Sequence, residues 1–363
     1  MSERIQSVFG QLASKMQVMI DSSFDLWKPT WFTKHFDFGV PTIGLDFTTV
    51  IGRSRIEAAA SVVDRESPAP LRTRALIEQL TGKVPAIKEA FKMSETDYRN
   101  MLTIQNIPNL DDATKQRMLL DLMFGDLQKA SNAPMKKLDI MCLQAMSTGK
   151  IKINAATNPD GLILPDVDLL MPAANMKKVV EKWSVSATAD PVTDIYNTVK
   201  AARAKGITYE KILMRIEVFW RMVQCTKFAA NISAFYNPGS GATVAITFDK
   251  VNEYLRANKL PYIEEVNEVI GVEKDGSISA IQPWEENNIT FVPAGKFGVI
   301  HNAFAMEELQ PVKMVDYAKA GRVLVSKWMS NNPWGEFTSC ELNAFPGVSV
   351  IDQIAIMQTE TKI

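Results

Sequence analysis

Histidine and cysteine are both scarce in this chain of 363 residues, which has two histidines and three cysteines. Neither His35 nor His301 has a second histidine or a cysteine at ligand spacing, so we expect no metal site. The cysteines, Cys142, Cys225 and Cys340, are far apart and odd in number. This excludes a disulfide framework and favours a reducing compartment.

Long apolar runs and an excess of charge are also missing. No run of 18 apolar residues occurs, and the N-terminus lacks the apolar core of a secretory signal, so we expect no membrane span. The net charge is −1, which gives no basic signature for tight nucleic-acid binding. This net charge does not exclude a protein surface that lies near nucleic acid without binding it tightly.

The motifs of common enzymes are absent as well. Gly149-Lys150 lacks the upstream glycine of a phosphate-binding loop, because position 144 is Gln. Gly239-Ser240-Gly241 is neither a nucleophile elbow nor a dinucleotide fingerprint, because Pro238 and Val244 replace the required glycines. We therefore predict no catalytic, cofactor-binding or metal-binding residues, although a carboxylate active site without a motif stays open.

The stretch from residue 135 to 172 carries the clearest structural pattern. One face of a predicted helix is apolar, and it ends at Gly149, where a left-handed cap belongs. A hairpin with the turn Asn158-Pro159-Asp160-Gly161 follows directly. We expect the apolar face to pack on this hairpin; the residues chosen for that contact are Leu138, Met141, Cys142 and Ala145.

The first 92 residues do not read as a compact domain. Residues 1–20 fit an amphipathic helix, and an aromatic segment follows in which we single out Trp27, Trp31, Phe32 and Phe36. That segment either covers the chain's own core or lies across a neighbouring subunit. Residues 42–92 have a polar centre and suggest a long hairpin with arms near 56–63 and 71–80, with a helix as the alternative. The residues chosen as its tip are Asp64, Arg65, Glu66, Arg72 and Arg74.

The rest of the chain is predicted to be mixed α and β. Helices should begin after Ser94, at Asp111 or Asp112, and again near Asn132-Pro134. Residues 190–325 predict a separate α/β domain, with a helix capped by Asp190, one from 217 to about 232, and one capped by Asp249. Strands are expected at 211–216, 289–293, 323–328 and 348–357, with a hairpin turn at 274–277.

The order of these elements resembles the tailed-bacteriophage major capsid proteins of the lambda E type, which have the Hong Kong 97 phage capsid fold. The resemblance rests on the helix ending at Thr148-Gly149-Lys150, the Asn-Pro-Asp-Gly hairpin and the α/β domain after it. It implies an α+β fold with an N-terminal arm (1–41), an extended E-loop (42–92), and a peripheral domain with a long spine helix (93–189). An axial domain (190–325) follows, and a final segment (326–363) whose last strand returns to the peripheral domain. Hinges are expected near 172–190 and 325–340.

The resemblance also implies a function. The chain would build the icosahedral shell, from pentamers and hexamers, around the double-stranded DNA of a tailed phage. It would be a virion protein assembled in the host cytoplasm, without a cofactor, with a separate scaffolding protein, a portal and non-specific contact with DNA. Residues 35–82 contain no lysine, so this loop cannot supply the lysine–asparagine bond of some relatives. Non-covalent contacts would hold the shell, with or without a decoration protein. The alternatives are an encapsulin-type compartment shell and a soluble oligomeric α/β enzyme.

Overall fold

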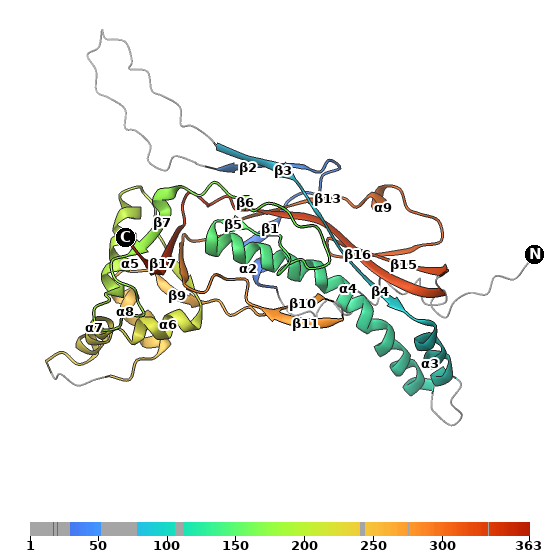
Figure 1. Cartoon of the computed structure of the whole chain (residues 1–363), viewed down its shortest axis with the longest axis horizontal. Coiled ribbons are helices and arrows are strands. Elements are labelled where there is room, and N and C mark those ends of the chain that lie inside the picture. Colours follow the sequence, from blue (N-terminus) through green and yellow to red (C-terminus); the bar gives the residue numbers. More distant parts are fainter. Residues whose placement is uncertain are drawn as a thin grey trace, which may run out of the picture.

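The computed structural model describes residues 17, 20, 30–51, 78–105, 112–239, 244–274, 276–332 and 334–363. The molecule is elongated, with a helical end and a long sheet-and-helix body (Figure 1). Two sheets organise these residues, one in each part. The fold is mixed α+β, as predicted.

A six-stranded sheet forms the body. Its order is β1-β13-β16-β15-β14, and β4 also pairs with β16. β1 runs parallel to β13, and the other neighbours are antiparallel. The strands are β1 (Phe36–Phe38), β4 (Ala86–Met93), β13 (Gly298–Ala303), β14 (Asp316–Ala320), β15 (Val323–Asn331) and β16 (Trp334–Gly347).

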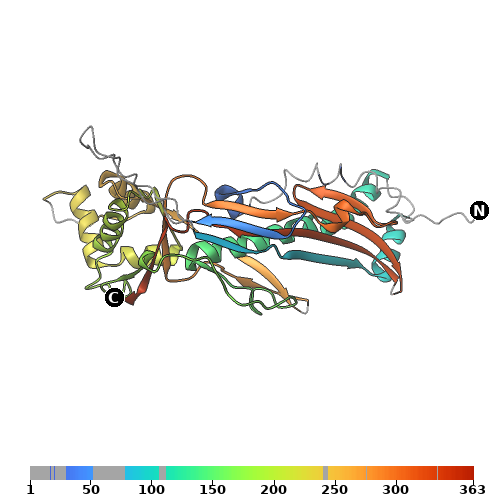
Figure 2. The ribbon, with the colours of Figure 1, turned by 90° about the horizontal axis from the view of Figure 1, so that it is seen from above.

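The long helix α4 (Asp112–Thr148) lies against this sheet, which Figure 2 shows in front of it. The helix is one continuous element of 37 residues, so our predicted third start near Asn132 is wrong. Pro134 lies inside it, where it removes one backbone hydrogen bond. Ala130, Ser131 and Pro134 itself are buried, and this packing supports the helix across the missing hydrogen bond.

Of the smaller helices of the body, the one predicted to begin after Ser94 does so. α3 (Glu95–Gln105) has a reciprocal cap in which Ser94 Oγ accepts from Asp97 N at 3.3 Å and Asp97 Oδ2 accepts from Ser94 N at 3.1 Å. α2 (Trp31–His35) precedes β1, and α9 (Met306–Leu309) follows β13.

A five-stranded sheet with the order β7-β17-β12-β8-β9 forms the other end. β7 and β9 are parallel to their neighbours β17 and β8, and the remaining pairs are antiparallel. The strands are β7 (Met176–Val179), β8 (Lys211–Met214), β9 (Tyr262–Glu265), β12 (Asn288–Val292) and β17 (Ala355–Lys362). Its helices are α5 (Pro191–Arg203), α6 (Ile216–Val223), α7 (Thr226–Tyr236) and α8 (Phe248–Ala257), and the short 3-10 helix η3 (Ala173–Asn175) precedes β7.

Several local predictions in this part can be checked directly. Asp190 caps α5 by accepting from Thr193 N at 3.2 Å, as predicted. The helix expected from 217 to 232 is two helices, because the chain turns at Gln224 and restarts after Cys225. α8 is capped by Thr247 rather than by Asp249, since Thr247 Oγ1 accepts from Lys250 N at 3.4 Å.

Three two-stranded ribbons complete the strand pairing of the described residues. They are β2 (Asp46–Ile51) with β3 (Glu78–Lys83), β5 (Lys150–Ile151) with β6 (Val167–Asp168), and β10 (Ile270–Lys274) with β11 (Ser277–Ile281). The β10–β11 hairpin and the turn in which Gly161 N donates to Asn158 O at 3.3 Å were both expected. Gly149 ends α4 at φ 71°, as a helix-terminating glycine should.

The predicted strand at 348–357 is wrong in position. β16 ends at Gly347, residues 348–354 turn between the two sheets, and β17 begins at Ala355. β17 pairs with β12 and β7, so the last strand lies inside the five-stranded sheet. Apolarity alone marks both the buried turn and the buried strand, so pattern could not separate them.

The boundaries between the predicted parts also move. β4 is a full member of the six-stranded sheet, so the loop region ends before residue 86. The chain crosses between the sheets at 172–175, 293–297 and 348–354, and β13 to β15 belong to the body. The first predicted hinge includes one crossing, whereas 325–340 lies within the β15–β16 hairpin and cannot be a hinge between the sheets.

Candidate assembly surfaces

The predicted contact residues fall into three groups. The loop-tip residues Asp64, Arg65, Glu66, Arg72 and Arg74 lie outside the described residues, as do Trp27, the predicted arms at 56–63 and 71–77, and most of the first helix. The aromatic residues from 31 onward and the helix residues from 138 onward are both described.

The root of the loop is a regular antiparallel ribbon, in which Ile51 is opposite Glu78. Alternate residues of β2 are buried, and Phe47, Thr49 and Ile51 face the body. The Phe47 ring stacks on those of His301 and Phe345, each with its centroid 5.0 Å away. These contacts anchor the loop to the six-stranded sheet at its base.

A histidine completes this anchor. Thr49 Oγ1 and His301 Nε2 are 2.7 Å apart, joining β2 to β13. Burial lowers the pKa of His301, so at neutral pH its ring is uncharged and suited to this hydrogen bond. Gly347 is needed here, because a Cβ on it would lie 2.5 Å from both Thr49 Oγ1 and His301 Nε2.

The aromatic residues Trp31, Phe32 and Phe36 lie in the chain's own core, each no more than 4 % exposed. Their side chains are therefore not available to a neighbouring subunit, and our interface prediction for these three is corrected to the core-covering alternative. Composition could not decide this, because an aromatic segment is equally apolar in either setting.

A buried carboxylate explains how this segment is held. Asp139 on α4 is fully buried, and its Oδ1 accepts from Phe32 N at 2.8 Å. It thus satisfies one of the free N–H groups at the start of α2, whose own N-cap residue Thr30 makes no side-chain cap. Burial raises the pKa of Asp139 to about 6. No motif in the sequence marks Asp139, and its one signal is its position as a charge within a long apolar stretch.

The helix residues chosen from sequence are all buried. Leu138, Met141, Cys142 and Ala145 are at most 1 % exposed. However, every residue from 138 to 147 is buried, so this part of α4 is enclosed on all sides instead of having one apolar face. Over its whole length, α4 contacts β16 and β4 of the six-stranded sheet as well as β5 of the predicted hairpin.

The C-terminal end of α4 joins the body to the five-stranded sheet. Thr290 Oγ1 donates to Met146 O, and Asn288 Nδ2 donates to Ser147 O, both at 2.8 Å. These side chains of β12 satisfy helix carbonyls that have no partner within the helix. The contacts fix the position of the long helix relative to the second sheet.

A second contact between the two parts surrounds His35 in the body and Phe297 in a crossing segment. The two rings are stacked with centroids 4.8 Å apart. Lys211 and Glu264 of the five-stranded sheet form an ion pair of 2.7 Å beside them, and Glu264 Oε1 lies 3.6 Å from His35 Nε2. Burial, together with Lys211, Lys34 and Lys296, lowers the pKa of His35 to about 3, so the ring is neutral at physiological pH.

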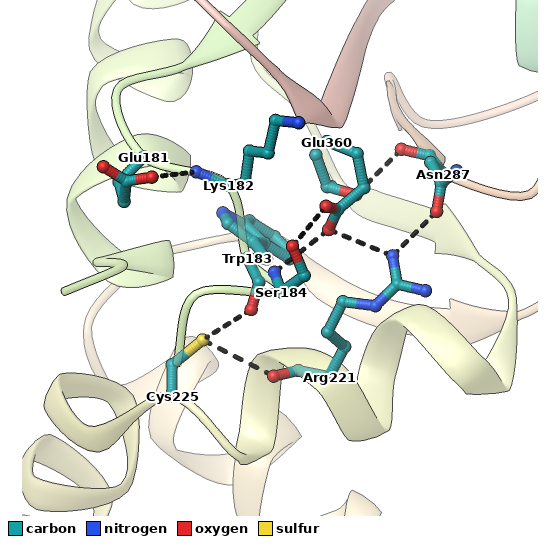
Figure 3. Close-up of polar contacts among 9 residues, drawn as sticks. Glu181, Lys182, Trp183, Ser184, Arg221, Cys225, Asn287 and Glu360 are labelled. Carbon is teal, nitrogen blue, oxygen red and sulfur yellow. Dashed lines mark hydrogen bonds and ion pairs between the residues drawn. The ribbon is translucent and has the colours of Figure 1, made fainter. Parts of the chain in front are cut away.

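A polar cluster holds the end of β17 in the second part, and Figure 3 shows it. Glu360 accepts from Ser184 Oγ at 2.6 Å and from Arg221 Nη1 at 3.1 Å, and Arg221 also donates to Asn287 Oδ1 at 2.7 Å. Cys225 donates weakly to the carbonyl of Trp183. These contacts hold the end of β17 against the segment around Trp183 and against α6.

Neither a metal site nor a membrane span emerges from the described residues. They contain no group of three or more His, Cys, Asp or Glu side chains able to hold a metal ion. Their helices also include none that is long and apolar enough to cross a bilayer.

Comparison with known proteins decides the family. The profile of the phage major capsid protein E family matches residues 28–359. The chain belongs to this family. It is thus a major capsid protein, a component of the virion, and the phage branch is favoured over the encapsulin alternative. Comparison with curated protein sequences gives no match.

Solved structures show the same fold at low sequence identity. A protein assigned as a prophage capsid protein, from E. coli CFT073, is 14 % identical with a TM-score of 0.59, over 95 % of this chain and 98 % of that one. A phage-related protein from Bordetella bronchiseptica RB50 is 11 % identical with a TM-score of 0.53, over 95 % and 97 % of the two chains. The prediction of a phage capsid fold is therefore confirmed for the overall fold.

Proposed function

We propose that the chain forms pentamers and hexamers that close into an icosahedral shell around the double-stranded DNA of a tailed phage, and that it catalyses no reaction. The observation that carries this proposal is the family match over nearly the whole chain, together with the capsid fold. Closed symmetry repeats each contact many times, so a modest free energy per contact is enough to hold a shell.

We propose that the loop between β2 and β3 contacts an adjacent subunit. The contact residues would be Asp64, Arg65, Glu66, Arg72 and Arg74. Two features support this role. The β2–β3 root projects from the upper edge of the body (Figure 1), and Phe47 and Thr49 hold it there. The tip residues are polar, and arginine is well suited to non-covalent interface contacts. Trp27 is retained as a proposed contact of the N-terminal arm.

Further partners follow from the same proposal. A separate scaffolding protein would guide assembly in the host cytoplasm, a portal would replace one capsomer, and a decoration protein would be optional. Packaged DNA would be contacted weakly and without sequence preference, because non-specific binding depends on an excess of basic side chains and the net charge here is −1. None of these partners requires a cofactor.

The experiment replaces the loop while keeping its root. Because Ile51 and Glu78 are paired, residues 52–77 can be exchanged for Asn-Gly, a two-residue turn that suits an antiparallel hairpin. We expect the wild type to give closed shells in negative-stain micrographs, and the shortened variant to stay folded by circular dichroism but form no closed shell.

Two results would count against this. Failure of the wild type, with its scaffolding protein, to form particles would contradict the shell function itself. Normal shells from the shortened variant would instead leave the shell function intact and contradict the contact role of the loop.

A further inference from the structure

The segment between β13 and β14 exposes a dense set of large apolar side chains. Met306 is 66 % exposed, Val312 57 % and Met314 77 %, and Leu309 is also exposed. All four occur within nine residues. A soluble surface rarely gathers apolar side chains so closely unless something covers them.

A second exposed apolar segment runs beside the end of β13, from which the first segment continues. Val40 and Ile43 are among the most exposed apolar residues described. Backbone hydrogen bonds hold their segment against the end of β13: Thr42 N donates to Asn302 O at 3.0 Å, and Phe304 N donates to Thr42 O at 2.9 Å. We name the exposed apolar residues of these two segments together the Met306 patch; it consists of Val40, Ile43, Met306, Leu309, Val312 and Met314.

We propose that the Met306 patch is a contact surface for a second copy of this chain. This inference rests on the proposed shell function, which supplies identical copies as the most abundant partner. The patch is also continuous with the loop root, because Ile43 lies three residues before β2, and α9 lies on the same upper edge as β2 and β3 (Figure 1).

The chemistry of the patch fits a contact that repeats with small variations. Pentamers and hexamers present the same surface at different angles. Methionine is unbranched and flexible, so Met306 and Met314 adapt to such differences better than a stiff side chain does. Glu308 lies within this segment and forms an ion pair with Lys319. Its charge is therefore balanced within the chain and does not disfavour an apolar partner.

The first test replaces both methionines. Met306→Asp with Met314→Asp puts two charges into the proposed contact, whereas Met306→Leu with Met314→Leu keeps it apolar and serves as the matched control. Met314 has φ 72°, a left-handed conformation that aspartate tolerates well, so the charged variant should still fold. We expect equal melting temperatures for the unassembled subunits, but shell yield at least about tenfold lower for the aspartate pair only.

The second test measures coverage directly and does not depend on a disruptive change. All three native cysteines are buried, so Met314→Cys introduces one reactive surface thiol. We expect a maleimide to label this thiol at least about tenfold more slowly in the assembled particle than in the dissociated subunit. A tenfold difference corresponds to a contact that opens at a free-energy cost of about 1.4 kcal/mol.

Normal shells from the aspartate pair, or equal labelling rates in both states, would overturn the proposal. Equal rates in purified shells would mean that the patch stays open for a different protein. If the wild type formed small oligomers in place of shells, the shell function would fail, and the labelling comparison in those oligomers would still decide whether copies meet at this patch.

Discussion

Asp139 offers the sharpest test of how the core is built, through the substitution Asp139→Asn. The carboxyl is buried between α4 and α2, and burial raises its pKa from 3.8 to about 6. The folded chain therefore holds this proton more tightly than the unfolded chain does. Stability is lost as the pH rises from about 4 through about 6, because a buried group must ionise.

The magnitude follows from the two pKa values. A pKa difference of about two units lowers the free energy of unfolding by roughly 3 kcal/mol once the carboxyl is ionised in both states. This full loss is reached only above pH 6. Asparagine keeps an oxygen to accept from Phe32 N but does not ionise. Its NH2 group needs an acceptor of its own, which takes back part of the gain. We expect the free energy of unfolding to rise by about 1–2 kcal/mol at pH 7.5 and to change little at pH 4.5.

Thermal melts of unassembled subunits at the two pH values would measure this. The control is Asp97→Asn, at an exposed carboxyl whose pKa is lowered by its hydrogen bonds with Ser94. Its ionised form favours the fold, so this stabilising effect is present above the usual pKa and lost as the pH falls. The control should therefore lose stability at pH 7.5. A loss of stability for Asp139→Asn that is larger at pH 7.5 than at pH 4.5 would show that the ionised form is favoured, and would refute the reasoning, whereas an equal loss at both would measure only the cost of the NH2 group.

Three further predictions concern the long helix and the cysteines. Leu138→Asp places a charge in a fully buried site at a cost of several kcal/mol and should give aggregated subunits in sedimentation, whereas Lys136→Glu should melt like the wild type. Gly149→Ala should lower the free energy of unfolding by about 1–2 kcal/mol in chemical denaturation, since φ there is 71°, whereas Gly44→Ala, which has open space around it, should not. Particles run on non-reducing gels should give chains of monomer size, since all three cysteines are buried, and a covalent ladder would contradict this.

Lys137 is adjacent to Lys136 on α4 but has a structural role of its own. Its Nζ donates to Thr157 O at 2.5 Å and Asn158 Oδ1 at 3.1 Å, which ties α4 to the hairpin turn. Burial lowers the pKa of Lys137 to about 8. Lys137→Glu should therefore destabilise the hairpin, whereas Lys136 remains a suitable site for the charge reversal.

Local chemistry in the sequence identified the start of α3, the end of α4, the Asn-Pro-Asp-Gly turn and the family. The reciprocal cap at Ser94 and Asp97, the glycine cap at Gly149 and the Asn-Pro-Asp-Gly turn each depend on residues within a few positions of one another. Such signals do not depend on contacts between distant residues, so they can be identified from the sequence alone. Their order along the chain pointed to the capsid family before any fold was known.

The tertiary structure decided where the elements go. The sequence did not show that β17 lies between β7 and β12, because one buried apolar strand looks like another until its partners are known. It did not show that Trp31 and Phe32 are core residues, since burial by the same chain or by a neighbour requires the same side chains. It could not place Asp139 under the start of α2, because that contact joins positions 107 residues apart. Burial depends on contacts between distant segments, and only the folded chain brings those segments together.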